Sequence, residues 1–257
     1  MKALLRMELS KLGRLASVRF SAVVLVVFPM LWAYAPGIFD VYGFFLVSGF
    51  QVPALALLSS MEFLLPLLIA ITCAELIGIE INHGTLPTVL LRPVTRAQWL
   101  LAKLMVASLY PFLALAFFLL TSLAAGAFFG FGPFVGGTGL GREGLLGAGL
   151  MLPADAWREV LQAYLVAAYS LVPIGLLAVL FAVVLMNAAG GALATLATLI
   201  VMHLLVVFPA ITPYLLTTQL STYVEPASPL GWMVALVAVY CAAFAAAAVI
   251  VFERKDF

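Results

Sequence analysis

The longest uncharged run of the chain, Val160–Val224, reads VLQAYLVAAYSLVPIGLLAVLFAVVLMNAAGGALATLATLIVMHLLVVFPAITPYLLTTQLSTYV. It holds 65 residues without Asp, Glu, Lys or Arg. A single helix of that length would be about 100 Å long, roughly three times the hydrocarbon thickness of a bilayer. The Asn-Ala-Ala-Gly-Gly stretch at 187–191 is the natural place for a turn. The run therefore predicts two membrane-spanning helices with a tight connection.

The composition of the whole chain supports the same class. Of 257 residues, 66% are hydrophobic and only 9% are charged, whereas soluble domains are about half apolar and a quarter charged. This excludes a water-soluble enzyme and a disordered chain. The apolar runs are too long and unbroken for the alternating strands of a transmembrane barrel. We expect an all-α polytopic membrane protein. The net charge of +1 gives no indication of nucleic acid binding.

Six spans account for the apolar runs, since a helix needs about 20 apolar residues to cross the hydrocarbon. Residues 1–257 form a single transmembrane domain. We place the spans at residues 20–39, 62–79, 99–129, 158–186, 190–212 and 229–252. Residues 40–61 are apolar but broken by glycine and proline, so they are expected to lie in or dip into the outer interface. Residues 130–157 form an outer loop, and residues 253–257 form a tail.

The basic residues fix the orientation. Ten of them fall on one side of a six-span chain: Lys2, Arg6, Lys11, Arg14, Arg19, Arg92, Arg96, Lys103, Arg254 and Lys255. Only Arg142 and Arg158 fall on the other side. Basic residues accumulate on the cytoplasmic side of membrane proteins, so both termini and the 80–103 loop are expected to be cytoplasmic.

The N-terminal residues 1–19 are predicted to form an amphipathic helix on the cytoplasmic leaflet. Leucines occupy one arc of this helix. Arg6, Lys11 and Arg14 lie outside that arc as interfacial anchors, and Lys103 marks the interface at the start of the third span. Glu8 projects into the apolar arc. It either pairs with a basic residue of the 80–103 loop or snorkels to water.

Known catalytic and metal-binding patterns are absent from the sequence. There is no phosphate-binding GxxxxGK[ST] loop and no HExxH, and the Cys and His residues do not have metal-ligand spacing. The GxGxxG match at 139–144 follows no strand and is expected to be loop. His203 lies within a span, where it is either functional or simply hydrogen-bonded to a carbonyl. Glu75 is the only carboxylate within a span, which disfavours an ion-coupled transporter.

The segment between the second and third spans carries the most specific signal. It reads ELIGIEINHGTLPTVLLRPVTRAQWLLAK over residues 75–103. Gly84-Thr85 can end one helix and cap a short new one. Pro93 stops that short helix, and Thr95 caps the next span. The segment is either a surface helix that docks in a partner or an ordinary connection with basic anchors.

This segment resembles the signature of ABC-2 type permeases, the membrane subunits of a class of ATP-binding cassette exporters. The resemblance rests on Glu80-x-x-x-Gly84-Thr85-Leu86, on the Leu-Arg-Pro-Val-Thr-Arg turn at 91–96 and on Lys103. The start with Glu8 and Lys11, the FERKD tail at 252–256 and the six-span layout are also similar. The outer loop 130–157 is longer and richer in glycine than the family pattern.

The resemblance implies a type V exporter-like topology, in which residues 80–98 form a coupling helix docked in a separate ATPase subunit. The residues that would couple to the ATPase are Glu80, Gly84, Thr85, Leu86, Val89, Leu90, Arg92, Pro93 and Arg96. ATP and magnesium would bind to that partner. A second permease copy would complete the pathway, residues 213–228 would form an outer re-entrant segment, and the location would be the bacterial cytoplasmic (inner) membrane.

The leading functional expectation is an ABC permease subunit that exports an apolar or amphipathic substrate. Within the same machinery, the chain could instead serve the maturation of an extracytoplasmic enzyme, or immunity to an antibiotic peptide, with an extracytoplasmic partner protein. An ATP-independent channel or membrane assembly scaffold is the alternative from another class.

Overall fold

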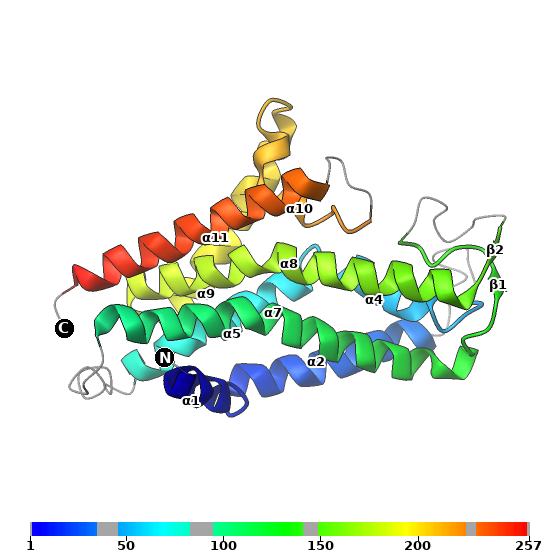
Figure 1. Cartoon of the computed structure of the whole chain (residues 1–257), viewed down its shortest axis with the longest axis horizontal. Helices are drawn as coiled ribbons and strands as arrows, with labels where there is room; N and C mark the ends of the chain where they lie inside the picture. Colours follow the sequence, from blue (N-terminus) through cyan, green and yellow to red (C-terminus); the bar gives the residue numbers. More distant parts are fainter. Residues whose placement is uncertain (1, 35–45, 83–94, 141–148, 225–229, 256–257) are drawn as a thin grey trace.

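The computed structural model describes residues 2–34, 46–82, 95–140, 149–224 and 230–255. Within these ranges the chain is helical apart from turns and one short ladder of two strands (Figure 1). Six helices are long and apolar enough to cross a membrane, which confirms the predicted number of long apolar helices. They are α2 (Ala16–Tyr34), α5 (Leu64–Asn82), α7 (Arg96–Gly126), α8 (Pro153–Leu185), α9 (Ala188–Leu204) and α11 (Leu230–Glu253).

The shorter elements precede or connect these helices. They are α1 (Lys2–Leu12), α4 (Gln51–Ser60), α10 (Leu216–Gln219), the 3₁₀ turns η1 (Ala127–Phe129), η2 (Leu205–Val207) and η3 (Thr212–Tyr214), and the strands β1 (Phe134–Val135) and β2 (Leu150–Met151). Figure 1 shows α1 and the end of α11 toward one end of the molecule and the two strands at the other. The segment after α9 rises out of the side of the bundle.

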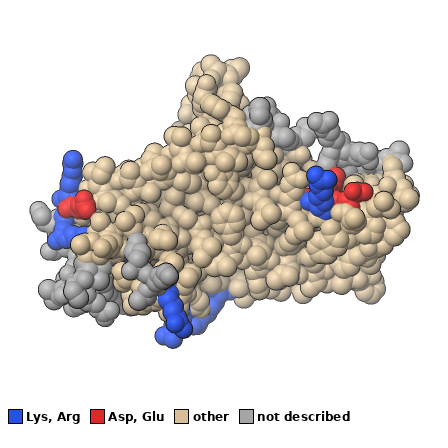
Figure 2. All heavy atoms as spheres, viewed as in Figure 1, with Lys and Arg blue, Asp and Glu red and all other residues tan. Residues whose placement is uncertain are grey.

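Helix α8 lies at the centre of the bundle and contacts α5, α7, α9 and α11. Most of its residues are buried, whereas α9 and α11 direct most of theirs outward. The outward residues are large and apolar, for example Leu193 and Ile200 on α9 and Val239 and Ile250 on α11. Figure 2 shows charged residues at the left end, on the lower edge left of the centre and toward the right end, with a broad uncharged region across the middle of the visible face. Such a surface suits hydrocarbon rather than water.

Helix α8 has 33 residues, which corresponds to about 50 Å and exceeds the hydrocarbon thickness of about 30 Å. It begins at Pro153, earlier than the expected residue 158, because proline suits the first turn of a helix. Asp155 lies in this extension, and Arg158 and Glu159 follow directly after it. The charged first turns of α8 therefore extend past the apolar region.

The turn between α8 and α9 lies at Met186 and Asn187, at the start of the 187–191 stretch expected to turn. Met186 adopts a left-handed conformation with φ of 52°, and the Asn187 side chain accepts a hydrogen bond from the Gly190 N–H at 3.2 Å. A Cβ on Gly191 would lie 2.7 Å from the Ala182 backbone. Only glycine permits this close approach, which lets α9 fold back along α8.

The described part of the 40–61 segment is more ordered than a simple interfacial stretch, because α4 is buried against α2 and α7. Its first residue, Gln51, accepts hydrogen bonds from the Val47 and Ser48 N–H groups and donates one to the Gly137 carbonyl. These bonds satisfy a polar side chain that is only 3% exposed. They also tie this segment to the 130–157 loop. In that loop, β1 and β2 pair antiparallel.

Candidate functional site

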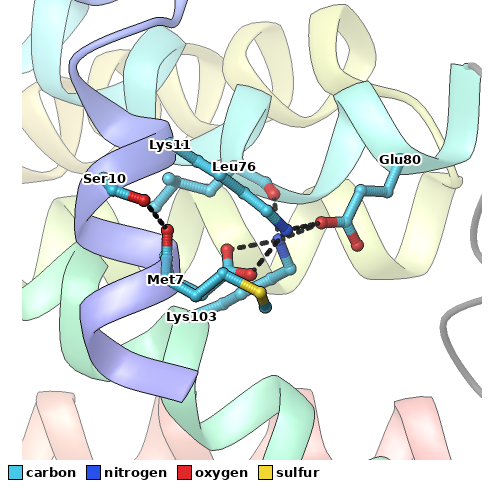
Figure 3. A network of polar contacts seen from close by, with 7 residues as sticks. Met7, Ser10, Lys11, Leu76, Glu80 and Lys103 are labelled. Carbon is cyan, nitrogen blue, oxygen red and sulfur yellow. Dashed lines mark hydrogen bonds and ion pairs between the residues drawn. The ribbon is translucent and has the colours of Figure 1, made fainter. Parts of the chain in front are cut away.

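Four charged side chains from three helices meet at the end of the bundle that carries α1 (Figure 3). Glu8 and Lys11 come from α1, Glu80 from the last turn of α5 and Lys103 from α7. Lys103 Nζ lies 3.0 Å from Glu8 and 3.1 Å from Glu80. Lys11 Nζ lies 2.8 Å from Glu8 and 2.9 Å from Glu80. Each ammonium group thus contacts both carboxylates, and we call this group the ionic cluster.

Lys103 is the most deeply buried member, with 1% of its surface exposed. Its ammonium group has three N–H donors, and the Leu76 carbonyl at 2.6 Å accepts a hydrogen bond beside those accepted by the two carboxylates. The same ammonium lies 4.8 Å from the centre of the Trp99 ring, which stacks on Phe252 of α11 at 5.2 Å. The ionic cluster is therefore continuous with an aromatic contact to the last helix.

Local sequence fixes the position of Lys103. Thr95 caps α7 by accepting a hydrogen bond from the Gln98 N–H at 3.2 Å, and the Gln98 side chain accepts one from the Thr95 N–H at 3.4 Å. This reciprocal pair is a capping box, which defines where the helix begins. Lys103 follows Thr95 by about two helical turns and faces α1 and α5 from that starting point.

Neighbouring charges hold Glu8 and Lys11 in the ionised state. Burial works to raise the pKa of Glu8, but the ammonium groups of Lys103 and Lys11 outweigh it, so the pKa lies below its ordinary value. Burial works to lower the pKa of Lys11, and hydrogen bonds to Glu8 and Glu80 outweigh it, so that pKa is raised. Two carboxylates and two ammonium groups give the ionic cluster no net charge.

Further polar contacts join the remaining helices at this end. The Glu75 carboxylate accepts a hydrogen bond from the Ser17 N–H at 3.1 Å, in the first turn of α2. Arg96 donates to the Lys255 carbonyl at 2.9 Å. The Lys255 ammonium donates to the Val183 and Val184 carbonyls at 2.8 and 2.7 Å, in the last turn of α8 where carbonyls lack helical partners.

The structure brings four of the residues expected at the site close to this end of the bundle, namely Lys11, Glu80, Arg96 and Lys103. Lys103 was expected to mark the interface, and it is instead buried among carboxylates, because Glu8 and Glu80 provide its counter-charges. Arg6 and Arg14 are exposed. Seven expected coupling residues lie outside the described residues: Gly84, Thr85, Leu86, Val89, Leu90, Arg92 and Pro93.

The partner expected for Glu8 from the 80–103 stretch is confirmed by its contact with Lys103. The sequence signal for this contact was the position of Glu8 on the leucine arc of an amphipathic helix. The contacts of Lys255 and the Leu76 carbonyl were not expected, because a backbone carbonyl that accepts from a distant side chain leaves no trace in a sequence pattern. Among the described residues, no group of three or more His, Cys, Asp or Glu side chains is placed to hold a metal ion.

Comparison with known families decides the identity. The sequence profile of the family described as ABC-2 family transporter protein matches residues 4–154, which is more than half of the chain. The chain belongs to the ABC-2 transporter family. The match extends from α1 into the first residues of α8 and includes all four members of the ionic cluster. A comparison with curated proteins found no matching sequence.

Membership of the ABC-2 family makes this chain a membrane component of a transporter and the non-catalytic permease part. The six apolar helices are those of a multi-pass membrane protein. In this ABC-2 protein the ionic cluster lies where α5 ends and α7 begins, on either side of residues 83–94.

Proposed function

We propose that this ABC-2 protein is the permease subunit of an ATP-driven exporter, and that its ionic cluster joins the ATPase-docking segment to the membrane helices. The observation that carries the proposal is the contact of Lys103 with both Glu8 and Glu80. This single side chain ties the amphipathic helix α1 to the two helices that flank residues 83–94. A displacement of that segment would move α1, α5 and α7 together.

The coupling segment would be residues 80–98 on the cytoplasmic side. Glu80 anchors it at the end of α5, and Arg96 anchors it at the start of α7 through the Lys255 carbonyl. The seven coupling residues between them would dock in the ATPase subunit. ATP and magnesium would bind in that subunit, and its closure would supply the energy for reorienting the helices.

The remaining features of the exporter follow from charge and surface. The distribution of basic residues favours cytoplasmic termini, with α1 lying on the inner leaflet of a bacterial cytoplasmic membrane. The outward apolar faces of α9 and α11 would contact lipid and a second permease copy in a homodimer. The broken helices η3 and α10 would belong to an outer re-entrant segment, and the apolar bundle suits an apolar or amphipathic substrate.

The experiment is to reconstitute the permease with its ATPase subunit in liposomes and to compare Arg92→Ala with Arg142→Ala. Arg92 lies in the proposed docking segment, whereas Arg142 lies in the loop expected on the opposite side. We expect Arg92→Ala to reduce ATPase association and ATP hydrolysis by the complex, with an unchanged melting temperature. Arg142→Ala should retain both. Equal behaviour of the two variants would contradict the docking assignment.

A further inference from the structure

A cavity of about 900 Å³ opens at the end of α5 that is far from the ionic cluster. Its wall comes from the turn between α4 and α5, the first turn of α5, the second half of α9, and the segment that runs through α10. Pro66 in this wall and Glu80 in the ionic cluster are separated by about 21 Å along α5. The cavity and the proposed coupling segment therefore lie toward opposite ends of the same helix.

Most of the wall is apolar. Leu196, Leu199 and Ile200 form the α9 side, and Phe63 and Pro66 form the α5 side. A cavity of this size and character accommodates a drug-sized apolar body. Several polar residues also line the cavity, namely Glu62, His203, Thr212, Thr217, Thr218, Ser221 and Tyr223.

Among the described residues that line the cavity, Glu62 is the only Asp, Glu, Lys or Arg, and the imidazole of His203 lies in the wall as well. Glu62 lies in the turn before α5, its side chain is exposed, and the ion pairs found in the described residues all belong to the ionic cluster. Burial raises the pKa of Tyr223, and the negative charge of Glu62 raises it further, which places this phenol near the carboxylate. The cavity thus presents a carboxylate that has no Lys or Arg partner in the described part of the chain.

Two hydroxyl groups in the same wall also lack partners. The side-chain oxygens of Thr217 and Thr218 are buried and form no hydrogen bond with described residues. Threonines in helices usually donate to a carbonyl in the preceding turn, as Thr195 and Thr198 do on α9. A buried hydroxyl without a partner is costly, but both oxygens are shielded from the open cavity, so Glu62 and the apolar wall are the features that favour a ligand.

We propose that this cavity binds an amphipathic organic cation, with its apolar body against α9 and its ammonium group against the Glu62 carboxylate. A neutral apolar molecule would leave Glu62 without a counter-charge, and an anion would be repelled by it. The inference rests on the proposed exporter function in one respect: only if the chain is an exporter is the bound cation its substrate. Binding itself needs no ATPase.

The test uses the full chain in phosphatidylcholine nanodiscs and the fluorescence of two probes. One probe is dansylated diaminooctane, which carries a free ammonium group, and the other is its uncharged N-acetyl derivative. We expect the amine to bind roughly tenfold more tightly than the acetylated probe, as a charge-assisted contact in a partly desolvated site would give.

The variants separate charge from shape. Glu62→Gln should remove the preference for the amine and leave binding of the acetylated probe within about twofold of wild type. The matched control Glu253→Gln, an exposed carboxylate at the far end of α11, should keep the preference. Leu196→Trp should weaken both probes by filling the cavity. Melting temperature and elution profile check that each variant is folded.

Equal affinity for the two probes in wild type, or an unchanged preference in Glu62→Gln, would overturn the inference. Adding phosphatidylethanolamine to the nanodiscs distinguishes the source of the cation. If this lipid competes with the amine probe, a membrane lipid is supported as the ligand. If it does not compete, a soluble amine is supported. If an ATPase subunit co-purifies but the amine preference is missing, this inference fails and the exporter proposal stands. If the amine preference is found but no ATPase subunit co-purifies, the binding site stands and the exporter proposal fails.

Discussion

Lys103 of α7 donates a hydrogen bond to Glu8 of α1 across 3.0 Å, although the two residues are 95 positions apart in the chain. Both side chains are almost fully buried. Glu80 and Lys11 complete the arrangement with one charge of each sign. The contact makes the N-terminal amphipathic helix part of the helical bundle, and the stability of that bundle should depend on it.

We expect Lys103→Met to destabilise the protein by about 3–5 kcal/mol, because it leaves two buried carboxylates with a single partly exposed ammonium group. Thermal unfolding of the purified chain in detergent would measure the effect. The control is Arg14→Met, a basic residue exposed in the turn between α1 and α2. The double variant Lys103→Met with Glu8→Gln should recover part of the loss, since one unpaired charge is gone. Equal melting temperatures for Lys103→Met and wild type would contradict the burial argument.

Acid should weaken the ionic cluster through Glu8. Its pKa lies below the ordinary value of 4.5, so its stabilisation is fully present above that pH and is lost as the pH falls through the lower folded pKa. The pKa of Lys11 is raised above 10.5, so its stabilisation is present below that pH and is lost as the pH rises through the folded pKa. Between these two values neither group changes the stability.

Melting temperature as a function of pH measures this behaviour, with Glu8→Gln as the comparison. The variant is expected to lose less stability than wild type on acidification, because it has no carboxylate to protonate at that position. If the melting temperatures of wild type and Glu8→Gln fall equally on acidification, other carboxylates cause the loss of stability in acid.

Gly49→Ala should destabilise the end of the bundle that carries β1 and β2 by about 1–3 kcal/mol, the usual cost of overpacking. A Cβ at this position would collide with the Gly126 carbonyl oxygen, and would lie 2.7 Å from the Phe131 ring and 2.9 Å from the Gly130 carbonyl. Gly132→Ala is the matched control, because nothing lies within 4 Å of its added Cβ. The unfolding temperature of Gly49→Ala should be clearly lower than that of Gly132→Ala. Identical values would mean that the neighbours of Gly49 move aside without loss of stability.

Asn187→Ala should cost about 1 kcal/mol, because it removes the side chain that caps α9. Asn187→Ser retains a capping oxygen and should stay within a few tenths of wild type. Hydrogen exchange of the first turn of α9 would report the loss locally. Unchanged exchange in Asn187→Ala would show that packing of Gly191 on α8 alone fixes the turn.

The long apolar helices could be predicted from sequence because each is about as long as the hydrocarbon layer is thick, or longer. Val160–Val224 had to fold back, and Asn187 marked the place. The partner of Glu8 could also be anticipated, since a carboxylate on a leucine arc needs a counter-charge. The burial of α4 could not be predicted, because Gln51, Gly49 and Pro53 suggest a broken segment when their tertiary contacts are unknown.

The cavity beside α5 gave no sequence signal either. Glu62 reads as an ordinary interfacial carboxylate, and Thr217 and Thr218 read as turn residues. Only the return of the chain after α9 brings these residues to the start of α5. Local patterns carry information about helices, whereas this wall combines segments about 150 residues apart.

Co-purification tests the central claim, that this ABC-2 protein is the permease subunit of an ATP-driven complex, most directly. The C-terminally tagged chain would be extracted gently from its native membrane, with and without a non-hydrolysable ATP analogue, and its partners identified by mass spectrometry. We expect a stoichiometric ATP-binding cassette ATPase that is lost from the Arg92→Ala variant and kept by Arg142→Ala. Recovery of the chain alone, in several detergents and with the analogue present, would contradict the account.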